Sequence, residues 1–191
     1  CKKELALDKD TIGDRKVIFV TGGSQGAKRF NEVIINMVRQ YKPKDLYFVI
    51  AVGKDNYELA SSMLKEEDSK YIKIEKFVYE MDKMYKASDL LITRAGALTI
   101  TELSIVRRPA ILVPLPTAAE NHQFFNAKAM ENAGAGILIE ENVLNETVLY
   151  DRIKDVIYDN KILETMGENA AKLYKPDVEG KIYEEIKEIV C

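Results

Sequence analysis

The chain has very little cysteine. Only Cys1 and Cys191 carry a thiol, and they stand at the two ends of the 191 residues. A disulfide framework or a structural metal site needs several cysteines at suitable spacing, so we expect neither. This usage of cysteine is typical of a reducing compartment, and we predict a cytoplasmic location.

Long apolar runs are also missing. No stretch approaches the roughly 20 residues that a membrane-spanning helix needs. The first ten residues, CKKELALDKD, lack the apolar core of a signal peptide. We therefore expect residues 1–15 to be a polar linker or lead-in and residues 16–191 to form one domain, since two complete lobes would not fit in this length. A polar start of this kind is compatible with a piece cut from a longer protein.

An excess of positive charge is absent as well. Lys and Arg number 28 against 31 Asp and Glu, and the net charge is −3. The basic residues are scattered, which argues against a nucleic-acid surface. The single histidine, His122, has no partner motif for a Ser-His-Asp triad and no spacing for a zinc site. With 47% hydrophobic and 31% charged residues, the composition is that of a soluble globular protein.

Short β-branched apolar runs alternate with amphipathic segments along the chain. This alternation indicates βαβ units, and we predict an α/β fold, a Rossmann-like doubly wound parallel sheet in the order 3-2-1-4-5-6. The strands are expected at 16–21, 46–52, 71–75, 90–93, 110–113 and 136–139. The helices are expected at 27–41, 57–65, 81–87, 98–106 and 123–132, with further helices beyond and a separate last one at 178–190 after Pro176.

In such a sheet, ligands bind at the carboxyl ends of the strands. The first strand runs into Gly22-Gly23-Ser24-Gln25-Gly26. Glycines allow backbone N–H groups to approach an anion, and the next helix directs its positive end to the same place, which favours a phosphate. The loop fits neither the P-loop pattern nor G-x-G-x-x-G, and a tight turn without a ligand is the alternative.

A second glycine follows the fourth strand, in Thr93-Arg94-Ala95-Gly96-Ala97-Leu98-Thr99, with Glu102 after it. Two positive helix ends at one crevice suit a diphosphate. Glu102, expected in the first helical turn, is able to accept two hydrogen bonds from a ribose diol. Thr99 and Glu102 also have the spacing of a capping box, and this structural role is the alternative.

The third loop runs from Pro114 through His122 and Gln123 to Asn126. Gln123 and Asn126 are three residues apart, so they share a helix face. Their amides both donate and accept hydrogen bonds, which suits the reading of sugar hydroxyls. For His122 a hydrogen-bonded structural role is the alternative.

Four segments in this order resemble the carboxyl-terminal domain of the MurG family: VTGGSQGAKRFN, TRAGALTITEL, RRPAILVPLP and ENHQFFNA. Members transfer N-acetylglucosamine from UDP-N-acetylglucosamine to undecaprenyl-diphosphate-linked muramoyl pentapeptide, which makes lipid II for peptidoglycan. The resemblance covers the chain from about Lys16 onward. It implies one lobe of a two-lobed GT-B glycosyltransferase.

The resemblance also implies roles for individual residues. The GGSQG loop would lie near the diphosphate and sugar, the Val78 backbone would read the uracil edge, and Glu102 would hold the ribose. Gln123 and Asn126 would recognise N-acetylglucosamine, while His122 departs from a double glutamine seen in some members. The expected substrate-binding residues are Gly23, Ser24, Gln25, Gly26, Val78, Gly96, Ala97, Leu98, Thr99, Glu102, His122, Gln123 and Asn126.

The same resemblance implies what this chain lacks. The acceptor site and the catalytic base belong to an amino-terminal lobe, through which the full-length protein contacts the cytoplasmic face of the membrane. We therefore expect no catalytic residue in this chain, and donor binding without transfer. Helix ends meet the leaving-group charge, so no cofactor is obligatory, although Mg²⁺ is compatible with a diphosphate. The alternatives are a donor-binding subunit of a two-chain N-acetylglucosaminyltransferase and a UDP-sugar epimerase lobe, whose acid and base these loops do not offer.

Overall fold

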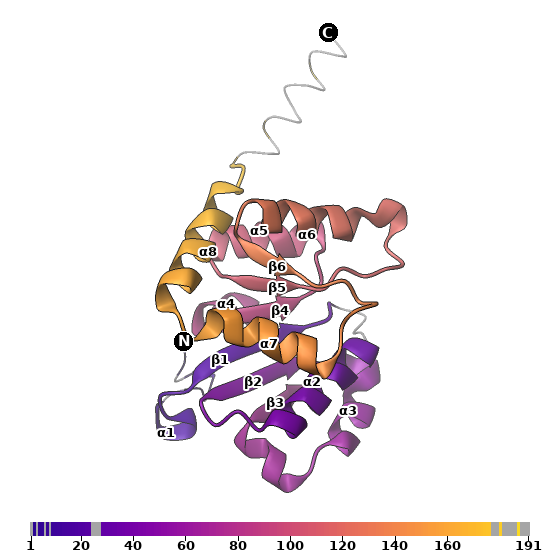
Figure 1. Ribbon diagram of the computed structural model, residues 1–191, viewed down its shortest axis with the longest axis vertical. Coiled ribbons are helices and arrows are strands. Elements are labelled where there is room, and N and C mark those ends of the chain that lie inside the picture. Colours follow the sequence, from indigo (N-terminus) through magenta and orange to yellow (C-terminus); the bar gives the residue numbers. More distant parts are fainter. Residues whose placement is uncertain are drawn as a thin grey trace.

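A computed structural model describes residues 2, 4–5, 7, 9–23, 28–176, 180 and 187. Its centre is a six-stranded parallel sheet in the order β3-β2-β1-β4-β5-β6, so the predicted α/β class and strand order are confirmed (Figure 1). The strands are β1 (Lys16–Thr21), β2 (Leu46–Ala51), β3 (Ile72–Glu75), β4 (Leu90–Thr93), β5 (Ala110–Leu112) and β6 (Gly136–Leu138).

Helices connect the strands. The α-helices are α1 (Lys9–Ile12), α2 (Lys28–Tyr41), α3 (Tyr57–Met63), α4 (Met81–Ala87), α5 (Ala97–Val106), α6 (His122–Asn132), α7 (Glu146–Ile157) and α8 (Asn160–Lys172). Short 3-10 turns lie at Lys54–Asn56, Glu66–Lys70 and Ala119–Asn121. Each predicted strand and helix up to residue 139 is present, with its ends within about two residues of the expected positions.

The sheet separates two apolar layers. Alternate residues of β1 point to opposite faces, so Ile18 joins one cluster while Phe19 joins the other. The first cluster includes α2, α3 and α7, and the second includes α4, α5 and α6. Both faces of the sheet are thus covered, which is why the strands are almost wholly apolar.

Part of the segment expected to be a polar lead-in packs against the sheet. Residues 1–15 contain the one-turn helix α1, and Leu7 and Ile12 are buried in the second cluster. The predicted last helix at 178–190 lies outside the described residues apart from Gly180 and Lys187. No helix in the part of the chain that the structure describes is both long and apolar enough to cross a membrane.

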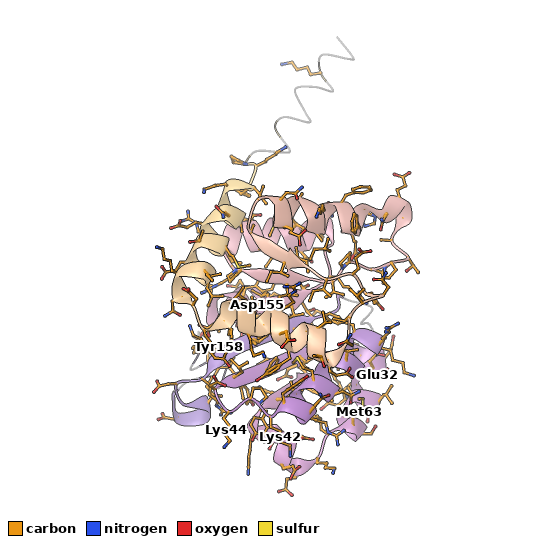
Figure 2. The ribbon with its side chains drawn as sticks, in the orientation of Figure 1. Glu32, Lys42, Lys44, Met63, Asp155 and Tyr158 are labelled. Carbon is orange, nitrogen blue, oxygen red and sulfur yellow. The ribbon has the colours of Figure 1, made fainter. Side chains whose placement is uncertain are left out.

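Polar side chains lie on the outer surface of these layers. Lys42, Lys44, Asp155 and Tyr158 are all exposed (Figure 2). The partial burial of the Tyr158 side chain, followed by its hydrogen bond with Asp45 and the charge of that carboxylate, raises the pKa of Tyr158 to about 12.

Candidate functional site

A pocket of about 400 Å³ opens at the carboxyl edge of the sheet. We call it the edge pocket. Its volume is in the range of small-molecule sites. It lies where the strand order reverses around β1 and β4, the place predicted for a ligand. Its lining residues are Thr21, Gly23, Ala51, Gly53, Lys76, Phe77, Val78, Met81, Tyr85, Thr93, Leu98, Thr99 and Glu102.

The end of β1 forms one wall of the edge pocket. Gly23 has a φ of +88°, a left-handed conformation that L side chains rarely adopt, so glycine is favoured there. Its N–H lies 3.4 Å from Thr21 Oγ1. Three predicted site residues of the same loop, Ser24, Gln25 and Gly26, lie outside the described residues.

The amino end of α5 forms a second wall. Gly96 caps this helix in an extended conformation, and its carbonyl accepts the first helical hydrogen bond, from Ile100 N–H at 3.0 Å. Ala97, Leu98 and Thr99 are therefore the first three helical residues, whose N–H groups have no partner within a helix. This end of α5 carries the positive pole of the helix dipole, which favours an anion.

The capping role predicted as an alternative for Thr99 and Glu102 is wrong. A capping box needs its Thr just before the helix, but Thr99 is the third helical residue because Gly96 already ends the preceding loop. The expected placement of Glu102 in the first turn is wrong for the same reason, since Glu102 is the sixth helical residue. It lies in the second turn, where it lines the edge pocket.

Glu102 has a side-chain partner that sequence reasoning missed. The Tyr85 hydroxyl of α4 donates a hydrogen bond to Glu102 Oε2 at 2.9 Å. Tyr85 is 3% exposed, and its ring meets Phe19 edge-on with centroids 6.0 Å apart. Burial, followed by the charge and the hydrogen bond of Glu102, raises the pKa of Tyr85 well above its ordinary value. The phenol is therefore a neutral donor at physiological pH, and no pattern in the sequence pointed to it.

The loop after β3 brings Val78 to the pocket. Val78 is buried, whereas its neighbours Phe77 and Tyr79 are exposed and contact each other edge-on at 5.0 Å between ring centroids. Lys76 also lines the pocket, and its ammonium lies 4.5 Å above the Tyr57 ring. This part of the pocket lining thus combines aromatic surface with an ammonium group, which also pairs with Glu58 Oε1 at 3.7 Å.

The predicted sugar-reading side chains lie on α6 and are not among the lining residues of the edge pocket. Asn126 Nδ2 donates to Ala95 O at 2.9 Å, which ties α6 to the loop just before α5. Gln123 Oε1 accepts a hydrogen bond from Leu115 N–H at 3.0 Å. His122 Nδ1 lies 2.7 Å from Ala119 O, as its predicted structural alternative requires. In each of these hydrogen bonds, one polar atom of an α6 side chain is paired with a backbone atom of a neighbouring loop or turn.

The turn that leads into α6 is unusual. Glu120 and Asn121 both have left-handed backbone conformations, with φ of 49° and 55°. Asn tolerates this region better than most residues, whereas Glu does not. The start of α6 at His122 is set by this turn, which the sequence pattern did not reveal.

Arg94 joins the loops at this edge of the sheet. It follows β4 directly, is 6% exposed, and its Nη1 donates to Val113 O at 3.1 Å and Pro114 O at 3.3 Å. The same nitrogen pairs with Glu141 Oε2 at 2.5 Å. The guanidinium carbon lies 5.0 Å from the Phe30 ring of α2. An arginine placed directly after a buried strand was the available signal, but its partner 47 residues away could not be read from spacing.

A shared metal site is not formed by the residues described. Across positions 9–23, 28–176 and the few others, no three His, Cys, Asp or Glu side chains are placed to hold one ion. The groups that line the edge pocket are helix N–H groups, one carboxylate, one phenol, one ammonium group, threonine hydroxyls and apolar surface.

Comparison with known proteins identifies the kind of domain. Residues 17–182 match the model of the Glycosyltransferase family 28 C-terminal domain. The chain is 37% identical, over 99% of its length, to the UDP-N-acetylglucosamine--N-acetylmuramyl-(pentapeptide) pyrophosphoryl-undecaprenol N-acetylglucosamine transferase of Ruminiclostridium cellulolyticum, of which it covers 52%. It is 38% identical, over 96% of its length, to the protein of the same name from Alkaliphilus metalliredigens, of which it covers 51%.

A solved structure supports the same assignment. The crystal structure of Acinetobacter baumannii MurG superposes with a TM-score of 0.81 and 28% identity, covering 91% of this chain and 52% of that protein. The chain thus spans about half the length of the relatives that it matches. On the match to the family model and the identity to these relatives, this chain belongs to the glycosyltransferase family 28 C-terminal domain family.

Proposed function

We propose that this domain binds UDP-N-acetylglucosamine as the donor half of an inverting N-acetylglucosaminyltransferase. The observation that carries the proposal is the edge pocket, in which the amino end of α5, the carboxylate of Glu102 and the buried Val78 line one cavity at the switch point of the sheet. The printed names of the relatives supply the sugar nucleotide.

Each part of the donor has a proposed partner. The uracil lies against Val78, the ribose diol donates to Glu102, and the diphosphate meets the first N–H groups of α5. Gly23, just after β1, is proposed to contact the diphosphate, and Ser24, Gln25 and Gly26 are expected to bind it too, although they lie outside the described residues.

The sugar is proposed to lie toward α6. Gln123 and Asn126 each have one amide atom tied to a neighbouring loop, which orients the other atom for a hydroxyl. His122 contacts the same sugar from the start of α6. Gly96 and Ala97 form the amino end of α5, and the bond between the diphosphate and the sugar is proposed to lie beside them.

The full-length protein is proposed to transfer the sugar to a lipid-linked muramoyl pentapeptide on the cytoplasmic face of the membrane, forming lipid II for the cell wall. The acceptor and the base that deprotonates its hydroxyl would come from the other half of the protein. Because transfer needs the attacking hydroxyl in line and a base within reach, we expect this chain alone to bind the donor without transferring the sugar. Donor binding requires no obligatory metal in this proposal, since helix N–H groups meet the diphosphate, and Mg²⁺ remains compatible with it.

Calorimetric titration with UDP-N-acetylglucosamine and UDP-glucose tests the proposal. Tighter binding of UDP-N-acetylglucosamine is expected. Glu102→Ala should weaken the binding of both ligands by about 1.5 to 3 kcal/mol, because a charge-assisted hydrogen bond to the ribose is lost.

Glu164→Ala is the matched control. Glu164 is also an exposed helical glutamate, but it lies on α8 and does not line the edge pocket. The control should bind as the wild type does. If no uridine nucleotide binds to the wild-type chain, the proposed function is wrong.

A further inference from the structure

Glu102 is an exposed side chain with one buried partner. An exposed glutamate samples many rotamers, and a ligand that needs one of them must restrict the side chain when it binds. Tyr85 removes part of this freedom, because its hydroxyl holds Glu102 Oε2 at 2.9 Å before any ligand arrives. The restriction is built into the fold, which is the condition for a preorganised site.

The phenol that holds Glu102 is itself rigid. Tyr85 is 3% exposed and lies on α4, which packs against α5, while its ring edge contacts Phe19 of β1. Both Tyr85 and Glu102 line the edge pocket. The hydrogen bond therefore joins two helices at the point where a ligand would contact the carboxylate.

We propose that Tyr85 is a positioning residue for the ribose of the donor: it occupies Oε2 of Glu102 and turns Oε1 toward the ribose hydroxyls. This inference rests on the proposed donor site. The phenol stays protonated because burial and Glu102 raise its pKa, so it donates to the carboxylate throughout the physiological range. Tyr85 thus acts on the ligand through Glu102, and its effect depends on the presence of ribose hydroxyls.

Tyr85→Phe is the variant that tests this role, because it removes the hydroxyl and keeps the buried ring. The affinities of the whole chain for UDP and for 2′,3′-dideoxyuridine diphosphate are measured by calorimetry, and the ratio of the two dissociation constants is taken within each protein. A partly unfolded fraction lowers both affinities equally and cancels from the ratio. The wild type should prefer UDP about tenfold, and Tyr85→Phe should lower this preference about threefold or more.

Tyr41→Phe is the matched control. Tyr41 also shares a hydrogen bond with a side-chain oxygen, Thr147 Oγ1 at 3.0 Å, but on the far helices α2 and α7. The ratio of the two dissociation constants in Tyr41→Phe should equal the ratio in the wild type. An equal loss of affinity for both ligands in Tyr85→Phe would show that Tyr85 only shapes the pocket, and it would overturn the inference while leaving the donor site in place.

A second variant covers the case in which Tyr85→Phe does not fold. Glu102→Gln keeps one acceptor oxygen and turns the other acceptor into an amide donor, so Tyr85 and the two ribose hydroxyls compete for the two lone pairs of that oxygen and the preference for UDP should also fall. A full wild-type preference in Glu102→Gln would overturn the inference. If neither ligand binds to the wild-type chain, both the inference and the proposed function fail.

Discussion

The two sides of the candidate site are built differently. On the β1–β4 side, most residues that line the edge pocket lie in helices and strands, with the rest in the loops after β1, β2 and β3, and Glu102 is held by a phenol on a neighbouring helix. On the α6 side, Gln123 and Asn126 are held by backbone atoms of loops, next to a turn with two left-handed residues. The first side is held mainly by packed helices and strands, which would suit the nucleotide of the proposed donor. The second depends on the shape of a loop, which suits selection among sugars.

Arg94 joins the two sides, and breaking its ion pair should have the largest effect. Arg94 and Glu141 have side chains that are 8% and 15% exposed. Glu141→Leu leaves the buried guanidinium unpaired, so we expect the free energy of unfolding to fall by about 3 to 5 kcal/mol. Urea denaturation, monitored by circular dichroism, measures the change in the free energy of unfolding.

Asp155→Leu is the control for this prediction. The Arg152–Asp155 pair has the same chemistry, but both side chains are 56% exposed. Its loss should change the free energy of unfolding by about 0.5 kcal/mol or less. Equal effects of the two variants would mean that Arg94 is not dependent on Glu141.

A ligand comparison separates the two sides of the site. Gln123→Ala should weaken the binding of UDP-N-acetylglucosamine by about 1 kcal/mol, because a sugar hydrogen bond is lost, and should leave the binding of UDP unchanged. Glu102→Ala should weaken the binding of both. Titration of each variant with both ligands measures the difference, and a loss of UDP affinity in Gln123→Ala would contradict the division into a nucleotide side and a sugar side.

The raised pKa of Tyr85 predicts a smaller effect, confined to alkaline pH. Burial and Glu102 raise the pKa of Tyr85 above its unfolded value of 10.0. The stability contributed by the protonated phenol is therefore complete below pH 10 and is lost as the pH rises above it. Each pH unit above 10 should cost at most about 1.4 kcal/mol, and less near pH 10 itself.

Comparison of the wild type with Tyr85→Phe isolates this effect from the other tyrosines. Tyr47 and Tyr158 also have raised pKa values, but they are present in both proteins. Urea denaturation at pH 9 and pH 11 should show a larger loss of stability in the wild type. The same loss in both proteins would contradict the prediction.

Most of the fold could be predicted because its signals are local. The apolar run at Lys16–Thr21 and the glycines after it mark a strand and a turn without any distant information. The helix boundaries near the site were harder to predict from the sequence. The helix begins at Ala97, two residues before Thr99, so the capping box that the spacing of Thr99 and Glu102 favoured is not formed.

The amino-acid sequence by itself determined the order of strands and helices, the edge of the sheet where the loops gather, and the family to which the chain belongs. Periodicity and turn residues act over a few neighbouring positions, so they can be read directly. Only the tertiary structure decided that Tyr85 holds Glu102 and that Arg94 pairs with Glu141. These contacts join residues from different helices and loops, and their geometry exists only once the helices have packed on the sheet.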